Sequence, residues 1–351
     1  MPGIVENDNN VNKANLLIDR ILIVGLGSIG RRHLGLAREQ FPNSDIRILR
    51  HEVHDTVPLH ANGYFSVLED ALAFSPQLAV IANPAPFHAA VAQALASIGC
   101  DLLIEKPLAD TWLSAVPLVK QAETCKQVFL LGYNLRYTES LQRFRQAYID
   151  GLIGRALSVR CEIGQYLPSW RPGSDYRKSV SARRQLGGGV LLELSHELDY
   201  LCWLFGEVQW VRATLARQSE LEIDVEDTAH LTLGFGEQSH PLVAVLTLDF
   251  IRHDTTRHCT IIGDAGSLRW NAISGVVDHH PARACAWQPL FVQVPERNQS
   301  YRAEWQHMIA CIEGQAQPLV TVHDGLHILK VIEAAHRSSS GAGVQILVGD
   351  I

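Results

Sequence analysis

The sequence of 351 residues lacks the marks of several protein classes. Its seven cysteines are odd in number and widely spaced, and no two form a C-x-x-C pair. Neither a disulfide framework nor a zinc knuckle is therefore indicated. No run approaches the roughly 20 apolar residues of a membrane span, and the net charge of −7 provides no basic excess for nucleic acid or anionic lipid. We expect a cytoplasmic protein without nucleic-acid or membrane partners.

The first residues lack the basic segment and apolar core of a secretory signal. We expect residues 1–19, which are rich in Asn and other polar residues, to form a flexible N-terminal arm. The whole chain is 47% hydrophobic and 19% charged, as in a globular protein. A chain of this length is too long to fold around one ordinary hydrophobic core, which predicts two domains.

Short β-rich runs alternate with helix-like segments in the first third of the chain. This β-α-β order predicts a doubly wound parallel sheet, the Rossmann architecture, over residues 20–135. The predicted strands are residues 21–24, 46–49, 78–82, 102–104 and 128–131.

Longer alternating strands follow, interrupted by one strong helix over residues 190–205. They predict an α+β substrate-binding domain over residues 136–351, with a large, mainly antiparallel open sheet and helices on one face. Helices at 302–312 and 325–336 are expected to pack back on the first domain. The predicted strands are residues 155–162, 210–218, 228–235, 242–250, 258–262 and 266–270.

A glycine-rich turn lies between the first strand and the first helix. It reads Gly25-Leu26-Gly27-Ser28-Ile29-Gly30. Glycines there allow a tight turn and a close approach of the backbone to a pyrophosphate, and the helix N-terminus offers free N–H groups. Gly25, Gly27, Ser28, Ile29 and Gly30 are therefore predicted to bind a dinucleotide, with an ordinary strand-helix turn as the alternative.

The second predicted strand ends at Arg50-His51, where a site for NAD usually has an acidic residue for the ribose hydroxyls. A cation at this place suits a 2′-phosphate. The cofactor is therefore predicted to be NAD or NADP, with a weak preference for NADP. Glu52 and Asp55 lie close enough in sequence to reverse that preference.

The tripeptide Glu105-Lys106-Pro107 follows a strand and so lies at the carboxyl edge of the sheet, where open α/β sheets bind ligands. Pro107 restricts Lys106 to an extended conformation, and the bond between them is a candidate for cis. An ammonium beside a reacting hydroxyl stabilises alkoxide charge and can relay a proton. The alternative is a surface lysine paired with Glu105.

Asn83-Pro84, followed by His88, comes directly after another predicted strand. We expect these three residues to line the pocket of a nicotinamide ring, although turn chemistry alone would explain the Asn-Pro pair.

Three glycines, residues 187–189, precede the predicted helix 190–205. At 100° per residue, His196 lies opposite the apolar stripe, and Glu193 and Asp199 each lie about 60° from His196. An imidazole held by carboxylates can accept a hydroxyl proton. The alternative without a catalytic role is a solvated helix face. A metal set of Glu193, His196 and Asp199 is a minor one, because no second helix supplies ligands; we predict no metal.

These motifs, together with the run Gly132-Tyr133-Asn134-Leu135-Arg136-Tyr137, make the chain resemble the glucose-fructose oxidoreductase, inositol dehydrogenase and MocA-like family of NAD(P)-dependent oxidoreductases. The resemblance covers about residues 20–337. It implies that Lys106 and His196 are the catalytic pair. Asp199 also fits the family pattern. The acidic residue expected four positions before the histidine is replaced by Leu192, so Glu193 is an uncertain stand-in.

The resemblance also implies a sugar, polyol or sugar derivative as substrate. The loop 166–185 is basic, which suits a carboxylate or phosphate on that substrate, although a solvated loop or a subunit contact is equally compatible. The residues predicted to bind substrate are His196, Asn134, Arg136, Tyr166, Trp170, Arg171 and Arg177.

The resulting hypothesis is hydride transfer between a nicotinamide and a secondary alcohol, with His196 as proton acceptor and Lys106 as alkoxide stabiliser. Asp199, with Glu193 as a second candidate, would orient the imidazole. Two alternatives keep the fold: a dinucleotide-sensing regulator and a glycosidase that retains its NAD. The family resemblance further implies a homodimer or homotetramer through the C-terminal sheet.

Overall fold

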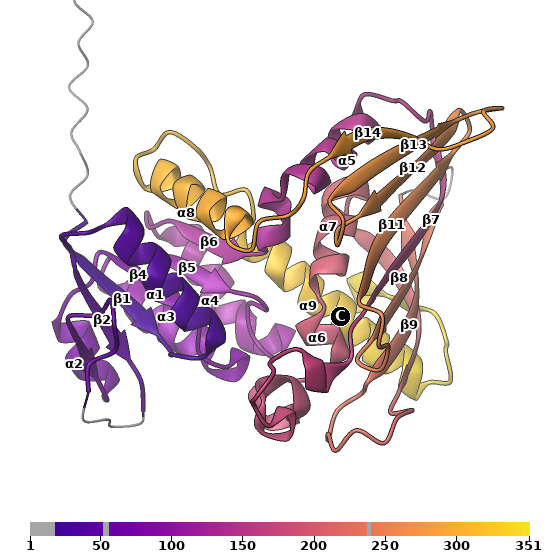
Figure 1. The fold of residues 1–351 in the computed structure, drawn as a ribbon. Helices are drawn as coiled ribbons and strands as arrows, with labels where there is room; N and C mark the ends of the chain where they lie inside the picture. The colour runs from indigo at the N-terminus through magenta and orange to yellow at the C-terminus, as the bar shows by residue number, and fades with distance from the viewer. Residues whose placement is uncertain (1–17, 52–55, 237–239) are drawn as a thin grey trace, which may run out of the picture.

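The structure, a computed structural model, describes residues 18–51, 56–236 and 240–351. The predicted arm therefore lies outside the described residues except for Ile18 and Asp19. The described chain contains two sheets, one of six strands and one of nine (Figure 1). This mixed α/β architecture, with a parallel and a mainly antiparallel sheet, is the predicted fold class.

The six-stranded sheet is wholly parallel, with strand order β3-β2-β1-β4-β5-β6. All four residues of β4 and of β6 are buried, as expected of strands covered on both faces. The order reverses between β1 and β4, and ligands bind at the carboxyl ends of strands at such a point. Its elements are β1 (Arg20–Val24), α1 (Ser28–Gln40), β2 (Asp45–Leu49), β3 (Gly63–Phe65), α2 (Leu68–Ala73), β4 (Leu78–Ile81), α3 (His88–Ser97), β5 (Asp101–Glu105), α4 (Trp112–Thr124) and β6 (Phe129–Gly132).

The nine-stranded sheet has the order β14-β13-β12-β11-β7-β10-β9-β8-β15, and only β7 and β10 pair in parallel. Alternate residues such as Val159 and Cys161 are buried, whereas Arg160 between them is exposed. Helices α5 (Glu139–Ile149), α7 (His196–Phe205) and α9 (Val322–Ser340) lie on one face of the sheet (Figure 1). The strands are β7 (Ala156–Gly164), β8 (Val208–Ala216), β9 (Thr228–Phe235), β10 (Leu242–Asp249), β11 (Thr256–Gly263), β12 (Gly266–Asn271), β13 (Val276–Pro281), β14 (Gln288–Val292) and β15 (Ile346–Leu347).

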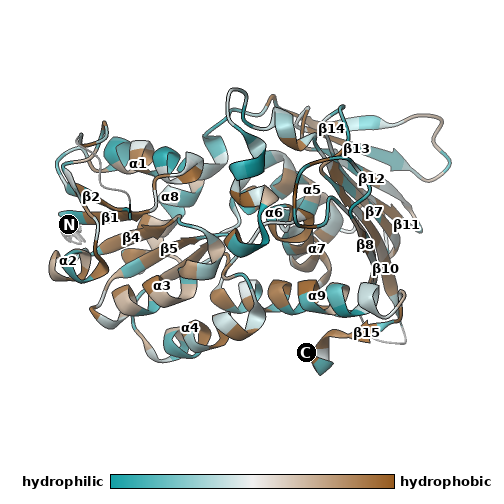
Figure 2. Cartoon of the chain, turned by 90° about the horizontal axis from the view of Figure 1, so that it is seen from below, coloured by the Kyte–Doolittle hydropathy of each residue, from teal (hydrophilic) through white to brown (hydrophobic). Residues whose placement is uncertain are grey.

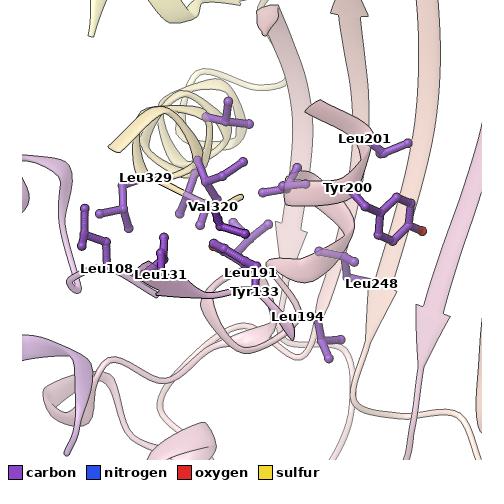
Figure 3. Close-up of a cluster of buried hydrophobic side chains, with 14 of the residues drawn as sticks. Leu108, Leu131, Tyr133, Leu191, Leu194, Tyr200, Leu201, Leu248, Val320 and Leu329 are labelled. Carbon is purple, nitrogen blue, oxygen red and sulfur yellow. The ribbon is translucent and has the colours of Figure 1, made fainter. Parts of the chain in front are cut away.

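The C-terminal helices connect the two sheets. Trp305 and Met308 of α8 (Gln299–Ile312) are buried in one apolar cluster with Ile21 and Ile23 of β1. Helix α9 packs against α4 and β8 and joins the two halves (Figure 2). A second cluster contains Leu131 of β6, and Figure 3 shows it beside Leu191, Val320 and Leu329. Burial of this apolar surface holds the two halves together.

The predicted helix 190–205 is wrong as a single element. It forms α6 (Val190–Glu193) and α7, with a break at Leu194 and Ser195. The Ser195 hydroxyl donates to the Leu192 carbonyl at 3.0 Å and accepts from the Tyr133 hydroxyl at 3.1 Å. Side-chain bonds of this kind compete with the helical ladder. Strands β3, β13, β14 and β15 were absent from the sequence prediction.

Candidate active site

The glycine-rich turn joins β1 to α1. Gly25 has φ +86°, and a Cβ there would lie 2.7 Å from the Asn83 backbone nitrogen. A Cβ on Gly30 would overlap the Gly25 carbonyl, whereas Gly27 faces open space. Helix α1 has no side-chain cap and no acidic residue in its first turn. The backbone is thus packed close on one side and free on the other, which fits a pyrophosphate at the helix N-terminus.

A cavity of about 370 Å³ lies beside this turn, at the ends of β1 and β2. Arg31, Arg50 and Thr56 are among its lining residues. The Arg50 guanidinium lies 4.5 Å from the centre of the Tyr64 ring and donates to the Thr56 carbonyl at 3.2 Å. Arg50 and Arg31 make the described lining of the cavity cationic. His51 is exposed, and Glu52 and Asp55 lie outside the described residues.

Lys106 follows β5 and reaches the other half of the molecule. The Lys106–Pro107 peptide bond is cis. The Lys106 ammonium donates to the backbone carbonyl of Glu193, the last residue of α6, at 2.8 Å. A side chain at the carboxyl edge of the first sheet therefore contacts the segment that leads into α7.

The Glu105 carboxylate holds the backbone of Lys106. Its carboxylate accepts from the Lys106 backbone N–H at 3.2 Å and contacts His33 Nε2 at 2.7 Å. Trp305 Nε1 can only donate, and it lies 3.0 Å from His33 Nδ1, so His33 carries its proton on Nε2 and donates to Glu105. The Glu105 side chain is thus bound within the protein, and its predicted cofactor contact stays a prediction.

His88 also has partners within the protein. It is 2% exposed, and its two ring nitrogens lie 2.6 Å from the Asn83 carbonyl and 2.9 Å from the Pro107 carbonyl. Burial lowers its pKa below the usual value. His88 therefore connects the segments after β4 and β5, and its predicted cofactor contact stays a prediction. The neighbouring Asn83 has a buried amide oxygen with no hydrogen-bond partner among the described residues, and Pro84 is half-buried.

His196 begins α7 and lies edge-on against the Tyr133 ring, with centroids 5.5 Å apart. Burial lowers its pKa well below 6.5, and the positive charges of Lys106 and Arg257 lower it further. Its Nδ1 atom is buried and has no hydrogen-bond partner in the described part of the chain. The imidazole is thus neutral near pH 7 and able to accept a proton, with the Lys106 charge beside it.

Asp199 does not orient this imidazole, contrary to the prediction. Its carboxylate accepts from Arg136 Nε and Nη2 at 2.7–3.1 Å, and both side chains are buried. Burial raises the pKa of Asp199 to about 6 even though Arg136 opposes the shift. Arg136 also contacts Asp324 at 3.1 Å and donates to the Leu319 carbonyl. Its guanidinium is thus bound inside the protein, and its predicted role in substrate binding stays a prediction.

The two partners of Arg136 differ in the direction of their pKa shift. The Asp199 pKa is raised because that side chain is fully buried. Burial also acts on Asp324, but Arg136 and Thr321 outweigh it and lower the pKa. The Asp324 side chain keeps 32% exposure, so its carboxylate loses less hydration than that of Asp199.

Glu193 contributes its backbone to Lys106, whereas its carboxylate accepts from the Ser181 hydroxyl at 3.0 Å. The last glycine before α6, Gly189, has φ +114°, and a Cβ there would overlap the Glu226 carboxylate. Glu226 accepts from the Leu191 N–H at 3.2 Å at the start of that helix. The carboxylates of Glu193 and Asp199 are therefore bound to Ser181 and Arg136, and a metal set with His196 is not assembled.

The remaining residues predicted to bind substrate divide into two groups. Asn134 is buried and donates to the Ser300 hydroxyl of α8 at 2.8 Å, so its amide connects elements of the protein instead. The aromatic residues of loop 166–185 are half-buried: Tyr166 packs on His253, and Trp170 packs edge-on against Phe250.

The basic residues of that loop face solvent. Arg171 is exposed, and Arg177 pairs with Asp175 at 2.8 Å and with Glu222 at 3.4 Å. Asp224 lies 3.9 Å from Arg183 and accepts from the Arg184 backbone. Neighbouring carboxylates thus offset much of the basic character on which the prediction rested.

Two charged residues near His196 escaped the sequence reasoning. Glu197 is fully buried, and Arg257 at the start of β11 lies 2.8 Å from its carboxylate. The sequence gives no periodic signal for this pair, because the two residues come from a helix and a distant strand.

Comparison with family models matches both halves of the chain. Residues 20–133 match the NAD-binding Rossmann fold of an oxidoreductase family, and residues 146–346 match its C-terminal alpha/beta domain. The chain belongs to the Gfo/Idh/MocA oxidoreductase family. Its Rossmann half is accordingly the NAD-binding domain.

Individual relatives are more distant. An inositol 2-dehydrogenase from Paenarthrobacter aurescens is 25% identical over 75% of this chain and 77% of its own length. A levoglucosan dehydrogenase from Pseudarthrobacter phenanthrenivorans is 32% identical, but over only 39% of this chain and 35% of its own.

Among solved structures, the WlbA dehydrogenase of Bordetella pertussis, in complex with NADH and UDP-GlcNAcA, superposes with a TM-score of 0.76 at 23% identity. The superposition covers 93% of this chain and 98% of the other. At this identity the likeness supports the fold. No helix among the described residues is long and apolar enough to cross a membrane.

Proposed function

We propose that this member of the family catalyses reversible hydride transfer between a nicotinamide cofactor and a secondary alcohol or ketone of a sugar, a polyol or an anionic sugar derivative. One observation carries the proposal. The Lys106 ammonium, from the first sheet, lies at the entrance to α7, where its charge lowers the pKa of His196. An amine and a neutral imidazole from different halves of the molecule thus act at one place.

The two side chains have distinct roles. A nicotinamide cofactor held by the Rossmann domain would supply the hydride-transfer chemistry. His196 is neutral and accepts the hydroxyl proton, and Lys106 stabilises the negative charge that develops on that oxygen. Glu105, held by His33, fixes the backbone of Lys106. The substrate class rests on the relatives, which are named as dehydrogenases of inositol and levoglucosan.

Absorbance at 340 nm tests this proposal directly. The protein is supplied with NAD or NADP and a panel of polyols, sugars and uronic acids, and Lys106→Ala is measured alongside the native chain. We expect turnover by the native chain, and we expect Lys106→Ala to lose it while it binds cofactor within about threefold of the native affinity. Full activity in Lys106→Ala would contradict the mechanism. Sugar hydrolysis without added cofactor would indicate the glycosidase, and cofactor binding without turnover would indicate the sensor.

The cofactor preference is proposed to be NADP. Arg31 and Arg50 line the cavity at the ends of β1 and β2, and guanidinium groups bind phosphate well. We expect Arg50→Ala to weaken NADPH binding at least tenfold and NADH binding less than threefold. Calorimetry with both cofactors measures this, and equal losses for the two would contradict the assignment.

We also propose a homodimer or homotetramer through the nine-stranded sheet. Helices cover one face of it (Figure 1). Burial alternates along β10, and Val245, between two buried residues, is 48% exposed. Val245→Glu should reduce the mass measured by light scattering if the interface includes Val245. All seven cysteines are unpaired, which supports a cytoplasmic location.

A further inference from the structure

Glu304 is a buried acidic residue that the proposed mechanism does not use. It lies in α8 and has no exposed surface. Both of its carboxylate oxygens are buried and lack a hydrogen-bond partner among the described residues. A carboxylate that loses its hydration without gaining a partner is strongly destabilised, so such a group takes up a proton instead. The surroundings of Glu304 therefore decide its charge.

On one side, Glu304 faces the short turn Asn134–Tyr137 that follows β6. Ser300 and His307 lie four residues before and three residues after Glu304, so the three side chains share one face of α8. Ser300 accepts a hydrogen bond from Asn134 at 2.8 Å. The His307 ring lies 5.5 Å from the ring of Tyr137. This face of α8 therefore covers the segment after β6.

On the other side, Glu304 adjoins the face of α8 that contacts the Rossmann half. Tyr301 lies one turn before Glu304, and its ring is edge-on to His33 with centroids 5.8 Å apart. Trp305 directly follows Glu304, and its Nε1 atom lies 3.0 Å from His33 Nδ1. Glu304 is thus placed between the His33 region and the segment after β6.

Glu105 lies where these two regions meet. Its carboxylate accepts from His33 Nε2 at 2.7 Å, and its backbone pairs with Gly132 at the end of β6. A Cβ on Gly132 would lie 3.3 Å from the Glu105 carboxyl carbon, so this carboxylate lies against the end of β6. The turn that α8 covers begins two residues later. Glu304 and Glu105 therefore share one buried region.

No cation contacts Glu304 in the part of the chain that the structure describes. The Arg32 guanidinium lies over the Tyr301 ring at 4.5 Å, and Arg136 is bound by two other carboxylates. Burial raises the pKa of Glu304 well above its ordinary value, and the negative charge of Glu105 raises it further. The titratable and charged groups of the region are Glu105, His33 and Arg32 of the Rossmann half, Arg136 and Tyr137 after β6, and Tyr301, His307 and Cys311 of α8.

We propose that Glu304 is a positioning residue that keeps its proton in the folded enzyme, so that no second negative charge displaces the Glu105 carboxylate. Glu105 then stays bound to His33 and to the Lys106 N–H. Two carboxylates that share a buried site repel each other. Loss of the Glu304 proton would therefore shift Glu105, and the backbone of Lys106 with it. The effect on turnover rests on the proposed function, whereas the protonation of Glu304 does not.

The variant Glu304→Gln tests the protonation, because an amide has the size of a carboxyl group and cannot ionise. Glu313→Gln, at the exposed end of the same helix, is the control. Infrared difference spectra, native minus variant, are recorded at pH 7 without cofactor. We expect the carbonyl band of a protonated carboxyl group in the difference for Glu304→Gln and not in that for the control. Absence of the band for Glu304→Gln would overturn the proposal.

The pH dependence of stability is a second measurement that needs no turnover. An unfolded glutamate titrates near about pH 4.3, and the folded Glu304 titrates well above that. Between these values the folded chain binds more protons, so its stability falls as the pH rises. Glu304→Gln escapes this loss. Its melting temperature minus that of the native chain should therefore increase by about 2 °C or more from pH 5 to pH 8. A constant difference would contradict a buried proton on Glu304.

Turnover tests the positioning role. With a substrate that the native chain oxidises, the ratio of kcat at pH 9 to kcat at pH 7 should be at least about threefold higher in Glu304→Gln than in the native chain and the control. Equal ratios in all three would overturn the positioning role and leave hydride transfer standing. No turnover by the native chain would overturn the proposed function and the positioning role together, while the infrared band and the melting temperatures would still decide whether Glu304 holds a proton.

Discussion

Two charged clusters lie along α7 and differ in the hydrogen-bonding groups that they leave without a partner. In the first, His196 lies beside Lys106 and Arg257, with its Nδ1 atom lacking a partner in the described residues. In the second, Asp199 is bound by Arg136, which also contacts Asp324. The first cluster holds a buried imidazole nitrogen without a partner among the described residues, whereas the carboxylate of the second is bound inside the protein.

The comparison shows why residues of one helix with similar chemistry have different roles. His196 and Asp199 are three residues apart, and a helical projection places them on neighbouring parts of one polar face. The fold places the imidazole near the end of β5 and the carboxylate against the segment after β6. The His196 imidazole, which has a nitrogen without a partner, can bind a ligand. The buried ion pair of Asp199 and Arg136 holds two segments of the protein together.

The largest expected effect is the loss of kcat from a change in the His196 cluster. His196→Asn keeps a polar side chain of similar size but removes the proton acceptor, so kcat should fall about 10²- to 10⁴-fold. Steady-state kinetics measures this, with the melting temperature as control for folding. A kcat within threefold of the native value would show that His196 is not the acceptor.

In the Asp199 cluster, Asp199→Ala should affect the free energy of unfolding more than kcat. It leaves the buried Arg136 with Asp324 and a carbonyl as its remaining partners, and should reduce the free energy of unfolding by about 3 kcal/mol. Urea titration gives this value. The kcat of the folded variant should stay within about threefold, and a shifted pH profile with unchanged stability would instead restore Asp199 as the group that orients His196.

A change at His88 should have an intermediate effect on catalysis, because His88 holds the segment next to Lys106 without being part of the proposed catalytic pair. His88→Ala removes the contacts with the Asn83 and Pro107 carbonyls and should allow Lys106 to move. We expect kcat to fall about tenfold, with KM for substrate nearly unchanged. A change in KM alone would contradict a role in positioning Lys106.

The lowered pKa of His196 predicts a smaller effect, on stability at acid pH. The unfolded imidazole titrates near 6.5 and the folded one well below it. Between these values the unfolded chain binds more protons, so stability falls as the pH drops below 6.5. His196→Asn cannot take up this proton. The melting temperature of the native chain should therefore fall more than that of the variant between pH 7.5 and 5.5, and equal slopes would contradict the assignment.

The smallest effect is expected in the loop 166–185. Arg177 is exposed and pairs with Asp175 and Glu222 at the surface. Arg177→Gln should change the free energy of unfolding by less than about 1 kcal/mol and leave KM for substrate unchanged. A rise in KM of tenfold or more would indicate that this loop binds substrate.

Local pattern predicted those parts of the fold and site that depend on neighbours in sequence. The run of apolar residues before Gly25 predicted a buried strand, and the fold class followed from the alternation of such strands with helices. The positions of Lys106 after β5 and of His196 at the helix followed from the same local signals. The domain boundary after Leu135 stays a prediction, although β6 ends at Gly132.

Contacts between distant segments could not be predicted. Trp305 fixes the tautomer of His33 across 272 positions of the chain, and Arg136 reaches Asp199 across 63. Neither residue carries a spacing signal that connects it to its partner. The break at Ser195 also depends on Tyr133, a residue of the other half.

A double-variant cycle on Lys106 and His196 tests the central claim that these two residues act together on one substrate. The kcat/KM values of Lys106→Ala, His196→Asn and the combined variant are compared with the native value. If both groups act in the same proton transfer, the combined variant should be about as slow as the slower single variant. If the two losses multiply, the residues act independently and the account is contradicted.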